Sequence, residues 1–336
     1  MVTIKELANI LGISTTTVSN VIHGKTSEVS LATVEKVQKL LEEYDYTPNI
    51  NARNLAQNRS KIIGMALFSN EDKYKNIVAD PFFGSLVGAI EKEVRKNNYF
   101  FMLYVSDDIS EIIRYVSSWN VDGLITVGMN RDEYLKIRGR YKKPIVLIDS
   151  YAPKDIMDYV NVGLDDEGGG YIMTKYLIEN GHREIAFICD NLEGVDYMRY
   201  RGFKKAVGEA GIVFDKKNLI IISPVEGETA VSMSEVYEAA QRVTATFCCS
   251  DNYALQVTNE LFARGMDVPG DVSIAGFDDN IFAKVCRPAL TTVYQDVDRK
   301  GTVAVEKLMA MLRGEENPKD EILPVKIVVR DSVRKL

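Results

Sequence analysis

The stretch LGISTTTVSNVIHG, residues 11–24, decides the fold of the first part of this 336-residue chain. Residues 4–11 carry their apolar side chains at helical spacing, and Thr3 stands three residues before Glu6, as in a capping box. Gly12 ends that helix, and a second short helix follows. Two short helices joined by a tight glycine turn are typical of the helix-turn-helix, whose second helix enters a DNA major groove.

The second helix turns small hydrogen-bonding side chains outward. We expect Ser14 to cap it, with an inward face made of Val18, Val21 and Ile22. The outward residues are Thr15, Thr16, Thr17, Ser19 and Asn20. Hydroxyls at a helix start hold phosphate oxygens, and threonine or asparagine farther along reaches base edges. A capped surface helix that binds no ligand can have the same residues. Only the rest of the chain can distinguish it from a DNA-binding helix.

A third helix, capped by Ser30, is expected to close a small three-helix head. Its apolar stripe consists of Leu31, Val34, Val37, Leu40, Leu41 and Tyr44. Residues 48–61 are polar and asparagine-rich like a linker, but Ala52 and Leu55 share a helical face. A helix this short is marginal in water and needs a partner, and a lone leucine on it suits insertion between base steps in a minor groove.

Length, composition and charge limit the classes of protein to which this chain can belong. The length predicts two or three units, and the lack of an apolar run of about 18 residues or of a signal peptide predicts a cytoplasmic protein. The four cysteines have no CxxC spacing, which favours buried thiols over a metal or redox site. The net charge is -7, but the first 60 residues hold six basic and six acidic side chains. DNA affinity must therefore come from positioned contacts and from pairing two heads.

The head and linker resemble the headpiece and hinge of the LacI/GalR family of transcriptional regulators. The matching segments are IKELANILGISTTTVSNVIHGK, residues 4–25, and VSLATVEKVQKLLEEYDYTPNINARNLA, residues 29–56. Asn20 departs from the arginine common in the family, and His23 departs from a common asparagine. Because an arginine grips guanine through two bonds, its loss leaves the operator sequence open.

The resemblance implies roles for individual residues of the head. Bases would be read by Thr15, Thr16 and Asn20. Phosphates would be contacted by Ser14, Thr17 and Ser19. The minor-groove wedge would be Leu55. We also include in the expected DNA-binding set Thr3, His23, Ser30, Asn49 and Ala52.

From residue 61 onward, short apolar runs alternate with helical stretches. The runs are KIIGMALF, YFFMLYV, GLITV and PIVLI, and then YVNV, EIAFIC, LIII, TATFCC and VSIAGF. Such alternation predicts parallel sheets covered on both faces. Two series with a break near residues 149–158 predict two similar lobes with a ligand cleft at the carboxyl ends of their strands. The expected fold is an all-α helix-turn-helix headpiece followed by an α/β, periplasmic-binding-protein-like core of two doubly wound parallel sheets.

The expected domains are a DNA-binding headpiece at 1–47, a hinge at 48–60, and an effector-binding and dimerisation domain at 61–336. Within the last, the first lobe is expected at 61–158 plus 291–320, and the second at 159–290 plus 321–336. The segment ILPVKIVVRDSV is expected to be one final strand. No leucine-repeat tail like that of tetrameric family members follows, which predicts a homodimer.

Polar residues stand at several strand ends of the expected core. Asp149 follows one such strand, Ser250 and Asp251 follow a second, and Asp278 and Asp279 follow a third, while Arg199 precedes a segment opening RGF. Carboxylates that accept two hydroxyls and an arginine with fixed donors suit a sugar, while Phe82 and Phe83 offer an apolar wall. An aspartate after a strand also caps the next helix, but several converging on one cleft favour a binding site.

The resemblance supports the same cleft. It implies effector contacts from Phe82, Phe83, Asp149, Arg199, Ser250 and Asp278. Ser250 stands where asparagine is frequent in the family and Gln256 where a small residue is usual, so the ligand stays open.

Catalysis is not expected, and neither is a cofactor or a metal. The two histidines, His23 and His182, are too few and too scattered for a triad or a histidine metal site, and the glycines of DDEGGGY fit no phosphate fingerprint. The sequence predicts a DNA-binding transcriptional regulator, a repressor, that binds a pseudo-palindromic duplex operator and is switched by a sugar or sugar derivative. The alternatives are a cytoplasmic small-molecule sensor whose head binds protein, and an enzyme using the cleft.

Overall fold

The computed structural model describes residues 2–46, 59–68, 76–151, 159–222, 229–315 and 319–336. Contacts divide the chain into two units, Met1–Ser60 and Lys61–Leu336, and each is described by itself. The boundary falls where the sequence predicts the core to begin. Among the described residues, no helix is both long and apolar enough to cross a bilayer.

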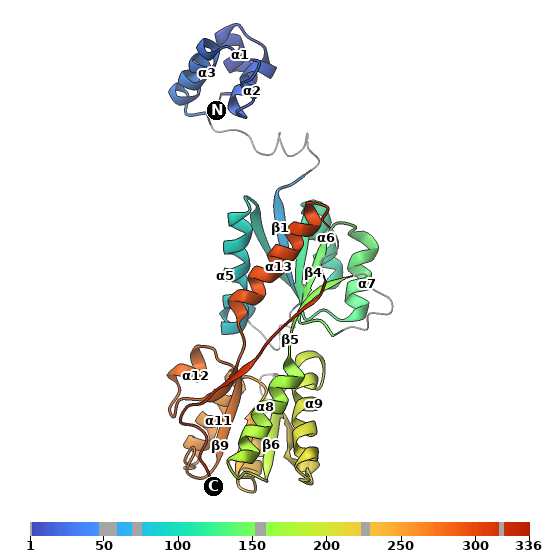
Figure 1. Ribbon diagram of the computed structural model, residues 1–336, viewed down its shortest axis with the longest axis vertical. Helices are drawn as coiled ribbons and strands as arrows, with labels where there is room; N and C mark the ends of the chain where they lie inside the picture. Colours follow the sequence, from blue (N-terminus) through green and yellow to red (C-terminus); the bar gives the residue numbers. More distant parts are fainter. Residues whose placement is uncertain (1, 47–58, 69–75, 152–158, 223–228, 316–318) are drawn as a thin grey trace. The chain divides into compact units, whose positions relative to one another are not determined.

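The first unit is the predicted helix-turn-helix head (Figure 1). Its helices are α1 (Ile4–Leu11), α2 (Thr15–Ile22) and α3 (Leu31–Glu43). Gly12 ends α1 with a φ of 64°, a left-handed conformation that glycine adopts without strain. The head's small core consists of Leu7, Ala8, Val18, Val21 and Val37.

The expected stripe of α3 is wrong at its two ends. Leu31 is 82% exposed and Tyr44 is 47% exposed. Leu31 is the first residue of α3, and Tyr44 is its C-cap. Only the central residue Val37 is fully buried.

The first lobe of the second unit is a six-stranded parallel sheet in the order β11-β5-β4-β3-β1-β2. Its strands are β1 (Ile62–Phe68), β2 (Phe100–Ser106), β3 (Gly123–Val127), β4 (Ile145–Ile148), β5 (Val160–Leu164) and β11 (Glu321–Leu323). Its helical elements are η1 (Ile77–Ala79), α5 (Pro81–Lys96), α6 (Ile109–Ser118), α7 (Arg131–Arg140) and α13 (Val297–Leu312). Helices α5 and α13 lie together on one face (Figure 1), and α6 and α7 cover the other.

The second lobe has a six-stranded sheet in the order β12-β10-β9-β8-β6-β7, parallel except for the pair β10 and β12. Its strands are β6 (Ile185–Cys189), β7 (Leu219–Ile221), β8 (Ala245–Cys248), β9 (Ser273–Asp278), β10 (Thr291–Tyr294) and β12 (Lys326–Val328). Its helical elements are α8 (Asp166–Glu179), α9 (Gly194–Glu209), η3 (Lys216–Asn218), α10 (Thr229–Ala240), α11 (Asp251–Ala263) and α12 (Ile281–Val285).

The sheet topology corrects the expected lobe boundaries. Strand β5 pairs with β4 in the first sheet, whereas the sequence places it in the second lobe. Strand β10 pairs with β9 in the second sheet, although its segment is expected in the first lobe. The expected last strand is two short ones, with β11 in the first sheet and β12 in the second. The chain therefore passes between the lobes at Asp165, at Gln295–Asp296 and at Pro324–Val325.

Helices α8 and α9 approach each other closely through glycines. A Cβ on Gly202 would lie 2.0 Å from the Glu167 carbonyl oxygen, and one on Gly170 would lie 2.1 Å from the Arg199 carbonyl oxygen. Gly170, the last glycine of DDEGGGY, thus belongs to a helix-packing surface. Close packing here sets the position of Arg199, which lies on α9.

We predict that Gly202→Ala lowers the free energy of unfolding by about 1–3 kcal/mol or more, because the added methyl group must displace backbone atoms. Urea denaturation of the purified chain measures this. The matched control is Gly208→Ala on the same helix, where a Cβ meets nothing within 4 Å. It should be neutral or stabilising by up to about 1 kcal/mol. Equal effects of the two substitutions would contradict the close helix contact.

Candidate functional site

The N-terminal end of α2 presents exposed hydroxyl groups. Ser14 Oγ accepts a hydrogen bond from the Thr17 backbone N–H at 3.0 Å and lies 2.8 Å from Thr17 Oγ1. Ser14, Thr15 and Thr16 are exposed, and Thr17, Ser19 and Asn20 are half-buried. The free N–H groups of a helix start favour an anion at this place. The arrangement suits a phosphate beside the helix start and base edges farther along it.

The other predicted DNA-binding residues fall into two groups. Thr3 and Ser30 cap α1 and α3, His23 ends α2, and all three side chains are exposed. Asn49, Ala52 and Leu55 lie outside the described residues, as does nearly all of the expected hinge at 48–60. The DNA contacts of both groups stay predictions.

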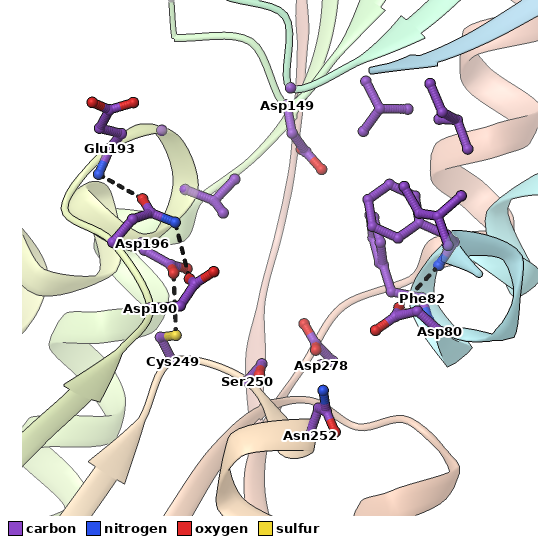
Figure 2. A pocket seen from close by; sticks show the side chains of 18 of the residues that line it. Asp80, Phe82, Asp149, Asp190, Glu193, Asp196, Cys249, Ser250, Asn252 and Asp278 are labelled. Atoms are coloured by element: carbon purple, nitrogen blue, oxygen red, sulfur yellow. Dashed lines mark hydrogen bonds between the residues drawn. The ribbon is translucent and has the colours of Figure 1, made fainter. Parts of the chain in front are cut away.

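A cleft of about 1020 Å³ lies between the lobes of the second unit. It is lined from the first lobe by the ends of β1, β3 and β4 and from the second by the ends of β8 and β9. All six predicted effector residues line it, namely Phe82, Phe83, Asp149, Arg199, Ser250 and Asp278. The other two strand-end carboxylates, Asp251 and Asp279, are not among the lining residues, because they accept hydrogen bonds within the second lobe. In Figure 2, Asp149 points into this cleft from the first lobe, and Ser250 and Asp278 lie opposite on the second.

Asp149 is already paired within the protein. Lys300 on α13 donates from Nζ to Asp149 Oδ1 at 2.9 Å and to Oδ2 at 2.7 Å. The Lys300 Nζ also donates to Gln295 Oε1 at 2.8 Å. Burial raises the pKa of Asp149, and the charge of Lys300 opposes that rise. The Asp149 carboxyl group therefore lies at the cleft wall with Lys300 bound to both of its oxygens.

Arg199 is held by groups of the second lobe. Its Nε donates to Asp166 Oδ1 at 2.8 Å, its Nη1 donates to the Cys249 carbonyl oxygen at 2.6 Å, and its guanidinium lies 3.6 Å from the centre of the Phe277 ring. Asp166 also accepts a hydrogen bond from Tyr151 Oη of the first lobe. These contacts fix the guanidinium plane at the cleft wall.

Asp278 lies next to this arginine at the end of β9. Its Oδ1 is 3.9 Å from Arg199 Nη1 and accepts a 2.6 Å hydrogen bond from Gln295 Nε2. Asp278 and Asp149 both have left-handed backbone, with φ values of 119° and 51°. Such strain in non-glycine residues is concentrated at functional sites, which supports the cleft as one.

Ser250 and the two phenylalanines have structural roles as well as places in the cleft. Ser250 caps α11 by accepting from the Tyr253 N–H at 3.3 Å. Phe82 and Phe83 open α5, whose cap is Asp80, and their rings meet edge to face at 5.2 Å. The apolar wall expected from the sequence is therefore present.

Several cleft residues were missed by sequence reasoning. Those that line the cleft are Asp80, Tyr151, Asp190, Asp196, Asn252 and Gln295. Asp166 and Lys300 do not line it but pair with the lining residues Arg199 and Asp149. Lys300 left a signal in the sequence, because it shares the apolar face of α13 with Val303 and Ala304. A lysine on a buried stripe needs an acidic partner. The partner, 151 residues away, has no such signal.

Asp190, Asp196 and Cys249 bring three possible metal-ligand atoms within 4.8 Å of one another. Cys249 Sγ donates to Asp196 Oδ2 at 3.3 Å, and burial raises the pKa of this thiol well above its ordinary value. The group is explained as a hydrogen-bonded thiol, in contrast to the thiolate that binds a metal. All four cysteines are free and buried, as the sequence predicts.

His182 has a structural role. Its ring nitrogens lie 3.0 Å from Thr244 Oγ1 and 3.0 Å from the Arg334 carbonyl oxygen. Burial lowers its pKa, so the neutral ring is favoured. It bridges the end of α8 to the last residues of the chain and lies outside the cleft lining.

We predict that Asp278→Asn flattens the pH dependence of stability. Burial raises the pKa of Asp278 from 3.8 to about 7, with Arg199 opposing the rise. At a pH between these two values, the carboxyl group is protonated in the folded state and ionised in the unfolded state. Its contribution to the free energy of unfolding is therefore lost as the pH rises. Asparagine keeps the acceptor for Gln295 and does not titrate. Urea denaturation of both proteins from pH 4 to 8 gives the free energy of unfolding as a function of pH. Parallel curves for the two proteins would refute the shifted pKa.

Comparisons with known proteins agree with this architecture. Residues 3–49 match the bacterial regulatory proteins of the lacI family, and residues 174–333 match a periplasmic binding protein-like domain. The HTH-type transcriptional repressor PurR of Vibrio atlanticus (strain LGP32) is 34% identical over 353 positions that cover 100% of both chains. PurR of Histophilus somni (strain 129Pt) is 31% identical with the same coverage.

Solved structures share the fold along nearly the whole chain. The transcriptional regulator CelR in complex with cellobiose is 27% identical, with a TM-score of 0.73 over 99% of this chain and 100% of its own. The lac repressor dimer bound to operator and the anti-inducer ONPF has a TM-score of 0.83 at 24% identity, over 99% of both chains. The chain belongs to the LacI family of bacterial regulatory proteins and is a DNA-binding transcriptional repressor, not an enzyme.

Proposed function

We propose that this repressor acts in the cytoplasm as a homodimer on a pseudo-palindromic operator, and that a neutral sugar in the cleft changes its operator affinity. The observation that carries the proposal is the cleft between the carboxyl ends of the two sheets, lined by polar groups of both lobes. A ligand that contacts both lobes favours the lobe arrangement to which it binds better.

The charges of the cleft favour a neutral sugar over a phosphorylated one. Among the described lining residues, seven carboxyl groups face two guanidinium groups. The carboxyl groups belong to Asp80, Glu133, Asp149, Asp190, Glu193, Asp196 and Asp278, and the guanidinium groups to Arg131 and Arg199. A phosphate would add negative charge to this set, whereas hydroxyl groups donate to carboxylate oxygens.

Shape and apolar surface also suit a sugar. Phe82 and Phe83 provide ring faces for its C–H groups, while Ser250 and Asn252 add polar groups at the second lobe. Ligand pockets combine such apolar walls with a few placed polar groups. The related regulator CelR was solved with cellobiose.

The head supports a paired mode of binding. Its charges balance, so a single head has little general attraction for phosphates. Two heads on one dimer would place their α2 helices in successive major grooves of a symmetric site. The hinge at 48–60, which lies outside the described residues, is the proposed element through which lobe movement reaches the heads, with Leu55 as the wedge.

The first experiment selects duplexes from a pool of randomised palindromes with the purified full chain. The selection is run without ligand and with a panel of sugars that includes cellobiose and ribose. Enrichment of one palindrome whose binding one neutral sugar changes is the expected result. Enrichment that no sugar changes would refute the effector, and no enrichment at all would favour a head that binds protein.

We predict that Asn20→Ala relaxes base preference at one operator position by about 1–3 kcal/mol, because asparagine pairs with adenine through two hydrogen bonds. The comparison variant is Ser14→Ala, which removes a helix cap and should weaken binding to all duplexes alike. Competition binding against single-base operator variants separates the two cases. A uniform loss from Asn20→Ala would make Asn20 a phosphate contact.

We predict that Arg199→Lys raises the half-maximal concentration of the selected sugar at least about tenfold, since lysine lacks the planar donor set. Operator binding without sugar should persist. Fluorescence anisotropy of labelled operator gives both quantities. The matched control is Arg201→Lys on the same helix, where Arg201 is 49% exposed and pairs with Glu167. If both variants respond to sugar like the parent protein, Arg199 does not contact the ligand.

A further inference from the structure

Lys300 is a buried cation with all of its hydrogen bonds made inside the protein. Its side chain is 1% exposed, and its three donors are used by the two oxygens of Asp149 and by Gln295 Oε1, at 2.7–2.9 Å. Its Nζ also lies 5.3 Å from the centre of the Phe82 ring. The ammonium group therefore has no hydrogen left for a ligand, although its three neighbours Asp149, Gln295 and Phe82 all line the cleft.

Gln295 stands where the chain crosses from the second lobe to the first. It follows the last residue of β10 and precedes α13. Its Oε1 accepts from Lys300, and its Nε2 donates to Asp278 Oδ1 at 2.6 Å. One amide group thus joins Asp149 of the first lobe, through Lys300, to Asp278 of the second.

Stability does not account for a lysine at this position. Burying two charges costs several kcal/mol, and well-packed apolar residues of similar volume are often at least as stable. A buried, hydrogen-bonded ion pair depends on the relative orientation of its groups, whereas an apolar contact does not. Its hydrogen bonds are made in one arrangement of the groups and broken in others. Since Lys300 holds the Gln295 side chain by its oxygen, the amide nitrogen is aimed at Asp278.

We propose that Lys300 is a positioning residue for the response to effector, and that the path Asp149–Lys300–Gln295–Asp278 holds the two lobes in their present arrangement. This rests on the proposed function, because Asp149, Gln295 and Asp278 line the cleft in which the effector would bind. Separation of the lobes breaks the bond between Gln295 and Asp278, while the Lys300 ion pair travels with the first lobe. A ligand that contacts Asp149 or Asp278 acts on the same path.

The test measures the distance between the lobes in the full chain without ligand. Trp119 in the first lobe and Val213 in the second are 57% and 94% exposed, so cysteines placed there accept spin labels, whereas the native cysteines are buried. Double electron–electron resonance then gives the distance distribution. Lys300→Met removes the ammonium, and Gln295→Met breaks the path while leaving the ion pair of Lys300 with Asp149 in place.

The matched control is Lys307→Met on the same helix. Lys307 pairs with Glu321 at 3.0 Å inside the first lobe, so its loss removes an ion pair without touching the second lobe. We expect a shifted or broadened distribution for Lys300→Met and Gln295→Met, and the parent distribution for Lys307→Met. Circular dichroism checks that each variant is folded.

Parent-like distributions for folded Lys300→Met and Gln295→Met would overturn the proposal, and so would an equal shift in the Lys307→Met control. If Lys300→Met does not fold, Gln295→Met decides alone, and a parent-like result for it excludes the path through Gln295. Since no ligand is present, this outcome is independent of whether a sugar binds. Failure of every sugar to bind would overturn the proposed effector and leave the measured lobe distances standing.

Discussion

The buried ion pair between Lys300 and Asp149 is the fixed point of the path that we propose holds the two lobes in their arrangement. Both groups are buried, and removing either one would leave an unpaired charge that costs several kcal/mol. The pair ties α13 to the end of β4, where Asp149 adopts a left-handed backbone. Because Gln295 shares the same ammonium group, this constraint extends into the connection between the lobes.

The cleft concentrates negative charge where two parallel sheets end. Strand ends are natural places for polar side chains, since the backbone there leaves the hydrogen-bonding ladder. Burial of several carboxyl groups together raises the pKa values of Asp149 and Asp278, and cations behind or beside them oppose the rise. A ligand of hydroxyl groups replaces lost water at such carboxyl groups, whereas an anionic ligand adds to the repulsion.

The head is stabilised by helix caps and a small core, in contrast to the large sheets of the two-lobe unit. Its helices are too short to be stable alone, so caps at Thr3, Ser14 and Ser30 and a small core hold them. Because the first 60 residues have no net charge, we expect recognition of DNA to depend on where a few hydroxyl and amide groups lie. A repressor built this way gains affinity by presenting two heads at once.

Local spacing in the sequence was enough to determine the helices of the head and the alternation of strands and helices in the core. The six cleft residues came from polar side chains at strand ends together with the family resemblance. Helices and strands have periods of about 3.6 and 2 residues, so each segment shows its own pattern in the sequence. Spacing assigned β5, β10 and β11 to the wrong lobe and predicted a buried Leu31 that is exposed. It gave no indication of the partners of Lys300. Those depend on which distant segments meet: strand pairing and a buried ion pair across 151 residues are decided only when the chain has packed.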